Sequence, residues 1–153
     1  MKIGRKRYGM GLVAALLATG AVAAGCGGDD DNATTTLSQS EFVAKATAIC
    51  QPVNQDIEAA AQKYLGSGRP TAQDFQQFAT AAVVPDTQHV IDQFKELTPP
   101  SSEADSYSAL IDELQKTNDQ VKANPQLLAQ QGNPYAKANE LAGQAGLDAC
   151  AAD

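Results

Sequence analysis

Cysteine is the residue type in this 153-residue chain that offers the widest range of chemistry, and the chain contains three of them, Cys26, Cys50 and Cys150. A thiol can be acylated, joined in a disulfide, bound to a metal ion or used as a nucleophile. The chain has no C-x-x-C motif and only one histidine, His89, so we expect neither a redox pair, a metal site nor a cofactor. In an oxidising compartment an odd number of cysteines leaves one thiol to be explained.

The residues before Cys26 have the order of an export signal. Lys2, Arg5, Lys6 and Arg7 precede an apolar run that ends just before Gly25. Basic residues, a short apolar stretch and a small-residue cleavage site are typical of a secretory signal peptide. The run is about 15 residues long, whereas a helix that crosses a bilayer needs about 20. We therefore expect residues 1–25 to be removed rather than to span a membrane.

The sequence Ala23-Ala24-Gly25-Cys26 resembles the lipobox of bacterial lipoproteins, although Ala23 stands where that family usually has leucine. The resemblance implies cleavage before Cys26, acylation of its thiol by chains such as palmitate, and anchoring at the outer face of the bacterial cytoplasmic membrane. The alternative is cleavage after Ala21-Val22-Ala23, which fits the A-x-A pattern and would give a secreted protein. If Cys26 carries lipid, Cys50 and Cys150 remain as an even pair for one disulfide.

Charge limits the partners of the chain. Residues 1–25 hold four basic and no acidic residues, so the remainder carries seven Lys and Arg against 18 Asp and Glu, a formal charge of −11. Nucleic-acid binding requires clustered cations and is excluded, and anionic headgroups would repel such a surface. Attachment to a membrane would therefore come from the lipid on Cys26. Residues 26–37 are small, acidic or hydroxylated and are expected to form a disordered tether to a domain at residues 38–153.

The apolar residues of that domain recur at spacings of three and four, as in helices, and no segment alternates like a strand. Capping boxes at Ser38/Glu41 and Thr71/Asp74 indicate the first two helices. Ser102 with Asp105 indicates a third helix, and Asn133-Pro134 a last one, with a short helical turn near Leu127 and Leu128 between them. Short connections favour antiparallel neighbours, so we predict an all-α fold, an up-down four-helix bundle with kinked helices, stapled by one disulfide.

The two ends of the domain, residues 42–50 and 146–150, resemble those of small uncharacterised helical lipoproteins of high-GC Gram-positive bacteria, a resemblance that implies no activity. A Cys50–Cys150 bridge would close a loop of about 100 residues and contribute roughly 4–5 kcal/mol in the chain-entropy model. Such a staple suits an alanine-rich core without tryptophan.

No residues form a recognisable catalytic motif. His89 stands beside an apolar stripe and is expected to be a boundary residue. Asp112 and Glu113 are adjacent on a helix and point in different directions, while Asp92 and Glu96 are expected to be solvated. G-x-S-x-G, H-E-x-x-H, Walker and calcium-loop patterns do not occur, so we expect no enzyme and no metal site.

Two prolines suggest a binding groove. Pro52 and Pro85 each lie fourteen residues after the predicted cap of their helix, so both kinks fall at mid-height if the helices are antiparallel. The kinks either bend the helices around a small core or open an apolar groove near four residues, Ile49, Val53, Val83 and Val84.

Three classes of function follow. The leading one is a non-catalytic, membrane-anchored module that binds an envelope protein. The second is a carrier of a small apolar ligand in the helical core. The third, an enzyme such as a helical mutase acting on an anionic metabolite, would need several buried cations, and the mature chain has a single arginine, Arg69.

Overall fold

A computed structural model describes residues 36–66, 68–130 and 133–151. The predicted signal peptide and Cys26 lie outside these residues. Contacts divide the chain into Met1–Asn32 and Ala33–Asp153, and every described element belongs to the second unit.

The all-α prediction is confirmed, since the described residues are helical and contain no strand. The elements are α1 (Gln39–Leu65), α2 (Ala72–Phe78), the π-helical η1 (Ala79–Val83), α3 (Val84–Lys95), α4 (Ala104–Ala123), α5 (Leu127–Gln130), α6 (Ala136–Gln144) and the 3₁₀ turn η2 (Asp148–Cys150).

Both predicted capping boxes are confirmed. At the start of α1 the Ser38 N–H donates to the Glu41 carboxylate at 3.0 Å, and the Glu41 N–H donates to Ser38 Oγ at 3.4 Å. Thr71 and Asp74 make the same reciprocal pair before α2, at 2.8 and 3.3 Å. Each box satisfies backbone donors that the first turn of a helix leaves without partners.

The second predicted helix contains a π turn at its proline. The Val84 N–H donates to the Ala79 carbonyl, five residues earlier, so one turn holds an extra residue. Pro85, which has no N–H to donate, is the second residue of α3 and comes directly after the π turn. Pro52, by contrast, lies inside α1, which continues to Leu65. The predicted disturbance at Pro85 therefore takes the form of a π turn.

Of the two remaining predicted helix starts, one is wrong. Glu103 precedes α4, and it makes no side-chain cap. Its N–H donates to the Pro100 carbonyl, and residues 101–103 form turns before the helix begins. Ser102 is thus not the cap. At α6 the Tyr135 N–H donates to Asn133 Oδ1 at 2.9 Å. A capping side chain accepts from the N–H two residues on, as Asn133 does here, so the predicted cap makes its bond although α6 is assigned only from Ala136.

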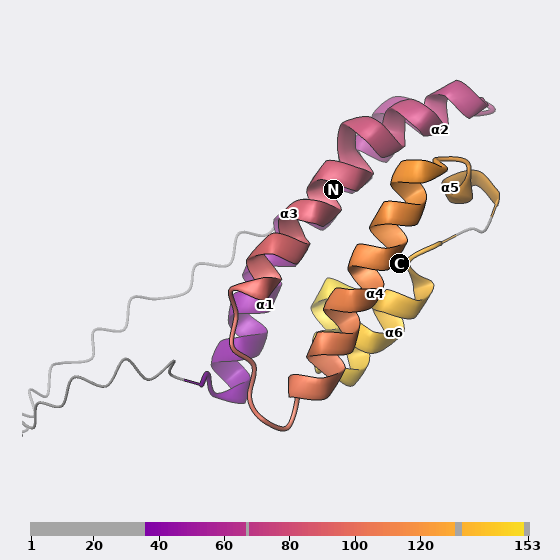
Figure 1. The fold of residues 1–153 in the computed structure, drawn as a ribbon. Helices are drawn as coiled ribbons and strands as arrows, with labels where there is room; N and C mark the ends of the chain where they lie inside the picture. The colour runs from indigo at the N-terminus through magenta and orange to yellow at the C-terminus, as the bar shows by residue number, and fades with distance from the viewer. Residues whose placement is uncertain (1–35, 67, 131–132, 152–153) are drawn as a thin grey trace, which may run out of the picture. The chain divides into compact units, whose positions relative to one another are not determined.

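The helices of this unit surround a common core (Figure 1). α1 packs against α2 and α3, α3 packs against α4, and α4 packs against α6, while η2 contacts both α1 and α6. The sulfur atoms of Cys50 and Cys150 lie 2.09 Å apart, the separation of a disulfide, and link α1 to η2. Six α-helices are labelled among the described residues; α2 and α3 belong to the second predicted helix, and α5 is the predicted short turn. The up-down four-helix bundle stays a prediction.

The core consists of two clusters of buried side chains. The first lies at the disulfide end, where the Phe42 and Tyr107 rings meet edge to face at 4.9 Å and Tyr107 Oη donates to the Phe94 carbonyl at 2.8 Å. The second gathers around η1 and includes Phe78 and Val83. Tyr135 packs against both clusters, which makes it the side chain at their junction.

Candidate functional site

A cavity of about 360 Å³ lies among α1, α2, α3, α4 and α6. Both core clusters contribute to it, Phe94 and Leu110 from the first and Phe78 and Val83 from the second. Its walls are mainly aliphatic and aromatic. The cavity therefore lies where the two halves of the core fail to meet completely.

The π turn brings residues on both sides of Pro85 to one wall. The lining side chains of this bent helix are spaced by three, five, four, three and four residues, and the step of five runs from Phe78 to Val83 across η1. An uninterrupted α-helix would place the residue four after Phe78 on that face. Because the π turn holds one extra residue, Val83, five residues after Phe78, lies on that face instead. The lining residues in question are Phe75, Phe78, Val83, Thr87, Val90 and Phe94.

The structure brings together two of the four residues predicted to form a groove. Val53 and Val83 line the cavity. Ile49 packs against the first core cluster and Val84 against the second, and neither lines the cavity. Val84 directly follows the lining residue Val83, so its side chain points about 100° away from that face of the helix.

A hydrogen-bond network lies behind the wall at Tyr135. The polar side chains that line the cavity are Asn54, Thr87, Asn133, Tyr135 and Asn139. Tyr135 Oη donates to Asn118 Oδ1 at 3.2 Å, and Asn118 Nδ2 donates to the Val84 carbonyl at 3.1 Å and to Gln88 Oε1 at 3.4 Å. Burial raises the pKa of Tyr135 to about 12, so its hydroxyl is neutral at physiological pH. Among the described residues, every buried side-chain nitrogen and oxygen has a partner.

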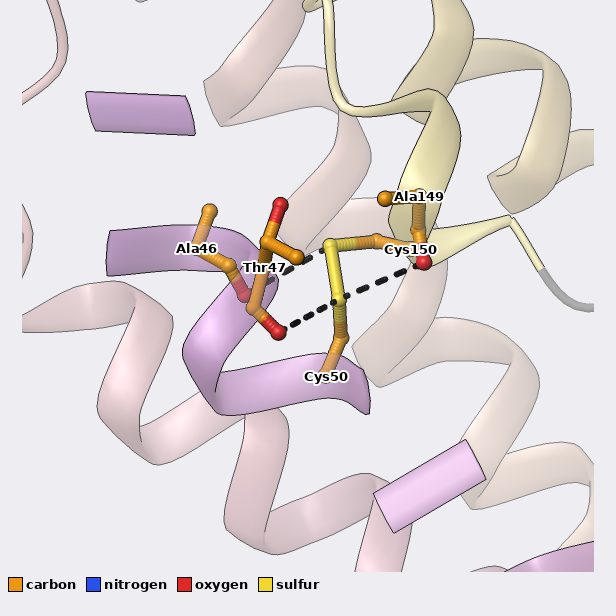
Figure 2. The surroundings of a disulfide bond; sticks show 5 residues. All are labelled: Ala46, Thr47, Cys50, Ala149 and Cys150. Atoms are coloured by element: carbon orange, nitrogen blue, oxygen red, sulfur yellow. Dashed lines mark hydrogen bonds between the residues drawn. A yellow bond between two sulfur atoms is a disulfide. The ribbon is translucent and has the colours of Figure 1, made fainter. Parts of the chain in front are cut away.

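The disulfide pair forms another part of the wall. Cys50 and Cys150 both line the cavity. Figure 2 shows the two sulfur atoms beside backbone carbonyls of α1 and of the C-terminal segment. Cys150 Sγ lies 3.5 Å from the Ala46 oxygen, and Cys50 Sγ lies 3.7 Å from that of Thr47 and 3.8 Å from that of Ala149. Breaking the bond would free η2 from α1 and alter this side of the cavity.

The residues considered for acid–base chemistry lie outside the cavity. His89 is exposed on α3, beside the Gln93 side chain. Asp92 accepts a hydrogen bond from Gln88, and Glu113 pairs with Lys116 at 3.0 Å. Within the described part of the chain, no three His, Cys, Asp or Glu side chains are grouped to hold a metal ion. The lining of the cavity contains no Asp, Glu, Lys, Arg or His.

Sequence reasoning did not identify the aromatic lining or the polar network. Nothing in the spacing of Tyr135 indicates a partnership with Asn118 seventeen residues earlier. A buried Asn in the middle of a helical stripe was the available signal, because a buried amide needs partners from other elements.

Over residues 36–66, 68–130 and 133–151, no helix has the length and hydropathy that a membrane crossing requires. No protein-family model, curated protein or solved structure matches the chain.

Proposed function

We propose that this chain is a non-catalytic, extracytoplasmic binding protein that holds a small apolar molecule in its cavity, within an up-down four-helix bundle. The observation that carries the proposal is the cavity itself. Its volume of about 360 Å³ lies within the range of about 300–1,000 Å³ that is usual for ligand pockets. A mainly apolar wall with a few fixed polar groups is also the usual composition of such sites.

The shape of the apolar surface favours a small molecule over an envelope protein. Val53, Ile57 and Leu114 are half-buried and face a hollow between helices. A volume of about 360 Å³ is enough for a small organic molecule. A protein partner would instead need a surface patch of several hundred Å².

The proposed location rests on the cysteines. Cys50 and Cys150 lie at disulfide distance, which leaves Cys26 as the remaining thiol, directly after the export-type segment. We propose that Cys26 carries lipid and anchors the protein at the outer face of the cytoplasmic membrane. The acidic charge supports attachment through the lipid rather than through the folded surface.

Binding of naphthalene, which has ten carbon atoms and is fluorescent, tests the cavity. We expect saturable binding with a Kd below about 1 mM, which corresponds to a binding free energy of about −4 kcal/mol. Val53→Phe should weaken binding at least tenfold, because the larger ring occupies the cavity. Val43→Phe is the matched control, since Val43 is also half-buried on α1 but does not line the cavity. No saturable binding to the unmodified protein would contradict the proposal.

A further inference from the structure

We propose that the ligand is an uncharged amphiphile whose polar head is a primary carboxamide. Its apolar body lies against α3 and α4, and its head lies beside the amide side chains of α1 and of the α6 segment, residues 133–144. This inference rests on the proposed function, and it specifies the class of molecule that the same cavity takes and the direction in which that molecule lies.

The lining of the cavity favours a ligand without charge. Among the described residues that line it there is no Asp, Glu, Lys, Arg or His, although the chain has 18 acidic and 11 basic residues. A carboxylate, phosphate or ammonium group that entered would lose water without gaining a counter-ion, which is unfavourable. The excess of acidic residues adds repulsion for anions.

The polar groups of the lining are unevenly distributed over the helices. The described lining residues of α2, α3 and α4 are aliphatic or aromatic, apart from Thr87 on α3. Asn54 lines the cavity from α1, and Asn133 and Asn139 line it from the α6 segment. All the amide side chains of the described lining thus come from α1 and the α6 segment, which gives an amphiphile a preferred direction.

The amide side chains also lie where the cavity is more open to solvent. Asn54 and Asn139 are half-buried and Asn133 is exposed, whereas Phe94 of α3 and Leu110 of α4 are fully buried. α1 and α6 both contact η2, but they are not packed against each other along their lengths as α3 and α4 are. A polar head between α1 and the α6 segment therefore keeps access to water while the apolar body is buried.

The hydrogen-bonding groups of Asn54 favour a carboxamide as the head. A side-chain amide donates through its nitrogen and accepts through its oxygen. No described residue hydrogen-bonds to the Asn54 side chain, so both groups are available to a ligand. A primary carboxamide presents an N–H and a C=O side by side and can pair with both. A ketone, an ether or a carboxylate only accepts and leaves the Asn54 oxygen without a donor.

Three naphthalene derivatives of nearly the same shape test the head group: 2-naphthamide, 2-acetonaphthone and 2-naphthoate. They carry an amino group, a methyl group and an anionic oxygen at the same position on the carbonyl carbon. Equilibrium dialysis against the full chain in its oxidised form measures their binding beside that of naphthalene. We expect 2-naphthamide to bind about 3- to 10-fold more tightly than 2-acetonaphthone, the gain from one net hydrogen bond. 2-Naphthoate should bind at least about tenfold more weakly than 2-naphthamide, because its charge has no counter-ion.

The variant Asn54→Leu locates the effect, because leucine is close to asparagine in size and has neither hydrogen-bonding group. It should bind 2-naphthamide and 2-acetonaphthone equally and should still bind naphthalene. The fold should tolerate the change, since no described residue loses a hydrogen-bond partner. Gln55→Leu is the matched control and should keep the preference, because Gln55 is an exposed amide on the same helix that does not line the cavity.

The outcomes separate the two proposals. Failure of naphthalene and of all three derivatives to bind would overturn the proposed function. Four other results would overturn this inference while leaving the cavity a binding site: binding of naphthalene without binding of 2-naphthamide, equal binding of 2-naphthamide and 2-acetonaphthone, binding of 2-naphthoate as tight as that of 2-naphthamide, or an unchanged preference in Asn54→Leu. The comparison of the probes on the unmodified protein decides the matter even where the variant does not fold.

Discussion

Reduction of the Cys50–Cys150 bond should lower the free energy of unfolding by about 4–5 kcal/mol. The two residues are separated by 100 positions. In the chain-entropy model, a closed loop of that length restricts the unfolded chain by about 4.7 kcal/mol at 25 °C. A domain of this size is usually stable by about 5–15 kcal/mol, so the bond accounts for a large part of the total.

Urea unfolding followed by far-UV circular dichroism measures this difference on oxidised and reduced samples of the same chain. With a slope of about 1.5 kcal/mol per molar, the midpoint should fall by about 3 M on reduction. The variant Cys50→Ala/Cys150→Ala should unfold like the reduced protein and should not respond to reductant. Cys26→Ser should respond as the unmodified chain does, since its remaining two cysteines form the bond.

A loss below about 1 kcal/mol on reduction would refute the reasoning. It would mean either that the unfolded chain is already compact enough for the link to restrict little, or that the two thiols are not joined. Free-thiol titration of the oxidised, unfolded protein distinguishes these cases. Reduction should also weaken naphthalene binding, because both half-cystines line the cavity.

Three further outcomes are expected. Cys26→Ser should move the protein from the membrane fraction to the soluble fraction of an expressing bacterium, and unchanged retention would contradict lipid anchoring. Asn118→Leu should destabilise the domain by about 1–3 kcal/mol in urea unfolding, because Tyr135 Oη loses its acceptor in a buried site. Asp119→Leu changes an exposed residue and is the control. A loss of stability in Asn118→Leu no larger than in this control would contradict the prediction. Hydrogen bonds from Ser38 and from Thr71 hold the pKa values of Glu41 and Asp74 below their ordinary values. The two caps therefore stabilise the fold above about pH 4.5, and this stabilisation is lost as the pH falls through the lowered pKa values. The double variant Glu41→Gln/Asp74→Asn should show a weaker loss of thermal stability between about pH 5 and pH 3, and an unchanged pH dependence would count against this assignment.

Features encoded within a few residues could be predicted from the sequence. The capping boxes at Ser38 and Thr71 involve side chains three residues apart, and the end of α1 follows from Gly66 and the segment up to Pro70. Pairing of the cysteines followed from counting them. These signals are local or depend on rare residues, so tertiary contacts do not override them.

The features that define the cavity depend on contacts between distant elements. Proline at position 85 predicts a disturbed helix, because proline has no N–H to donate. A kink, a break and a π turn can each accommodate this missing donor. Packing of this segment against α1 and α4 selects among the three. The predicted groove included both Val83, which lines the cavity, and its neighbour Val84, which does not. The start of α4 was wrong for a related reason, since local turns competed with capping at Ser102.

The π turn at Ala79–Val83 makes the cavity sensitive to chain length as well as to composition. One residue fewer in this segment would convert the turn to ordinary α-helix and rotate α3 by about 100° relative to α2. Phe75 and Phe78 would then face a different direction from Thr87 and Phe94, although every lining residue would still be present. Among related sequences, the spacing between Phe78 and Pro85 is thus as diagnostic of this cavity as the identity of any residue that lines it.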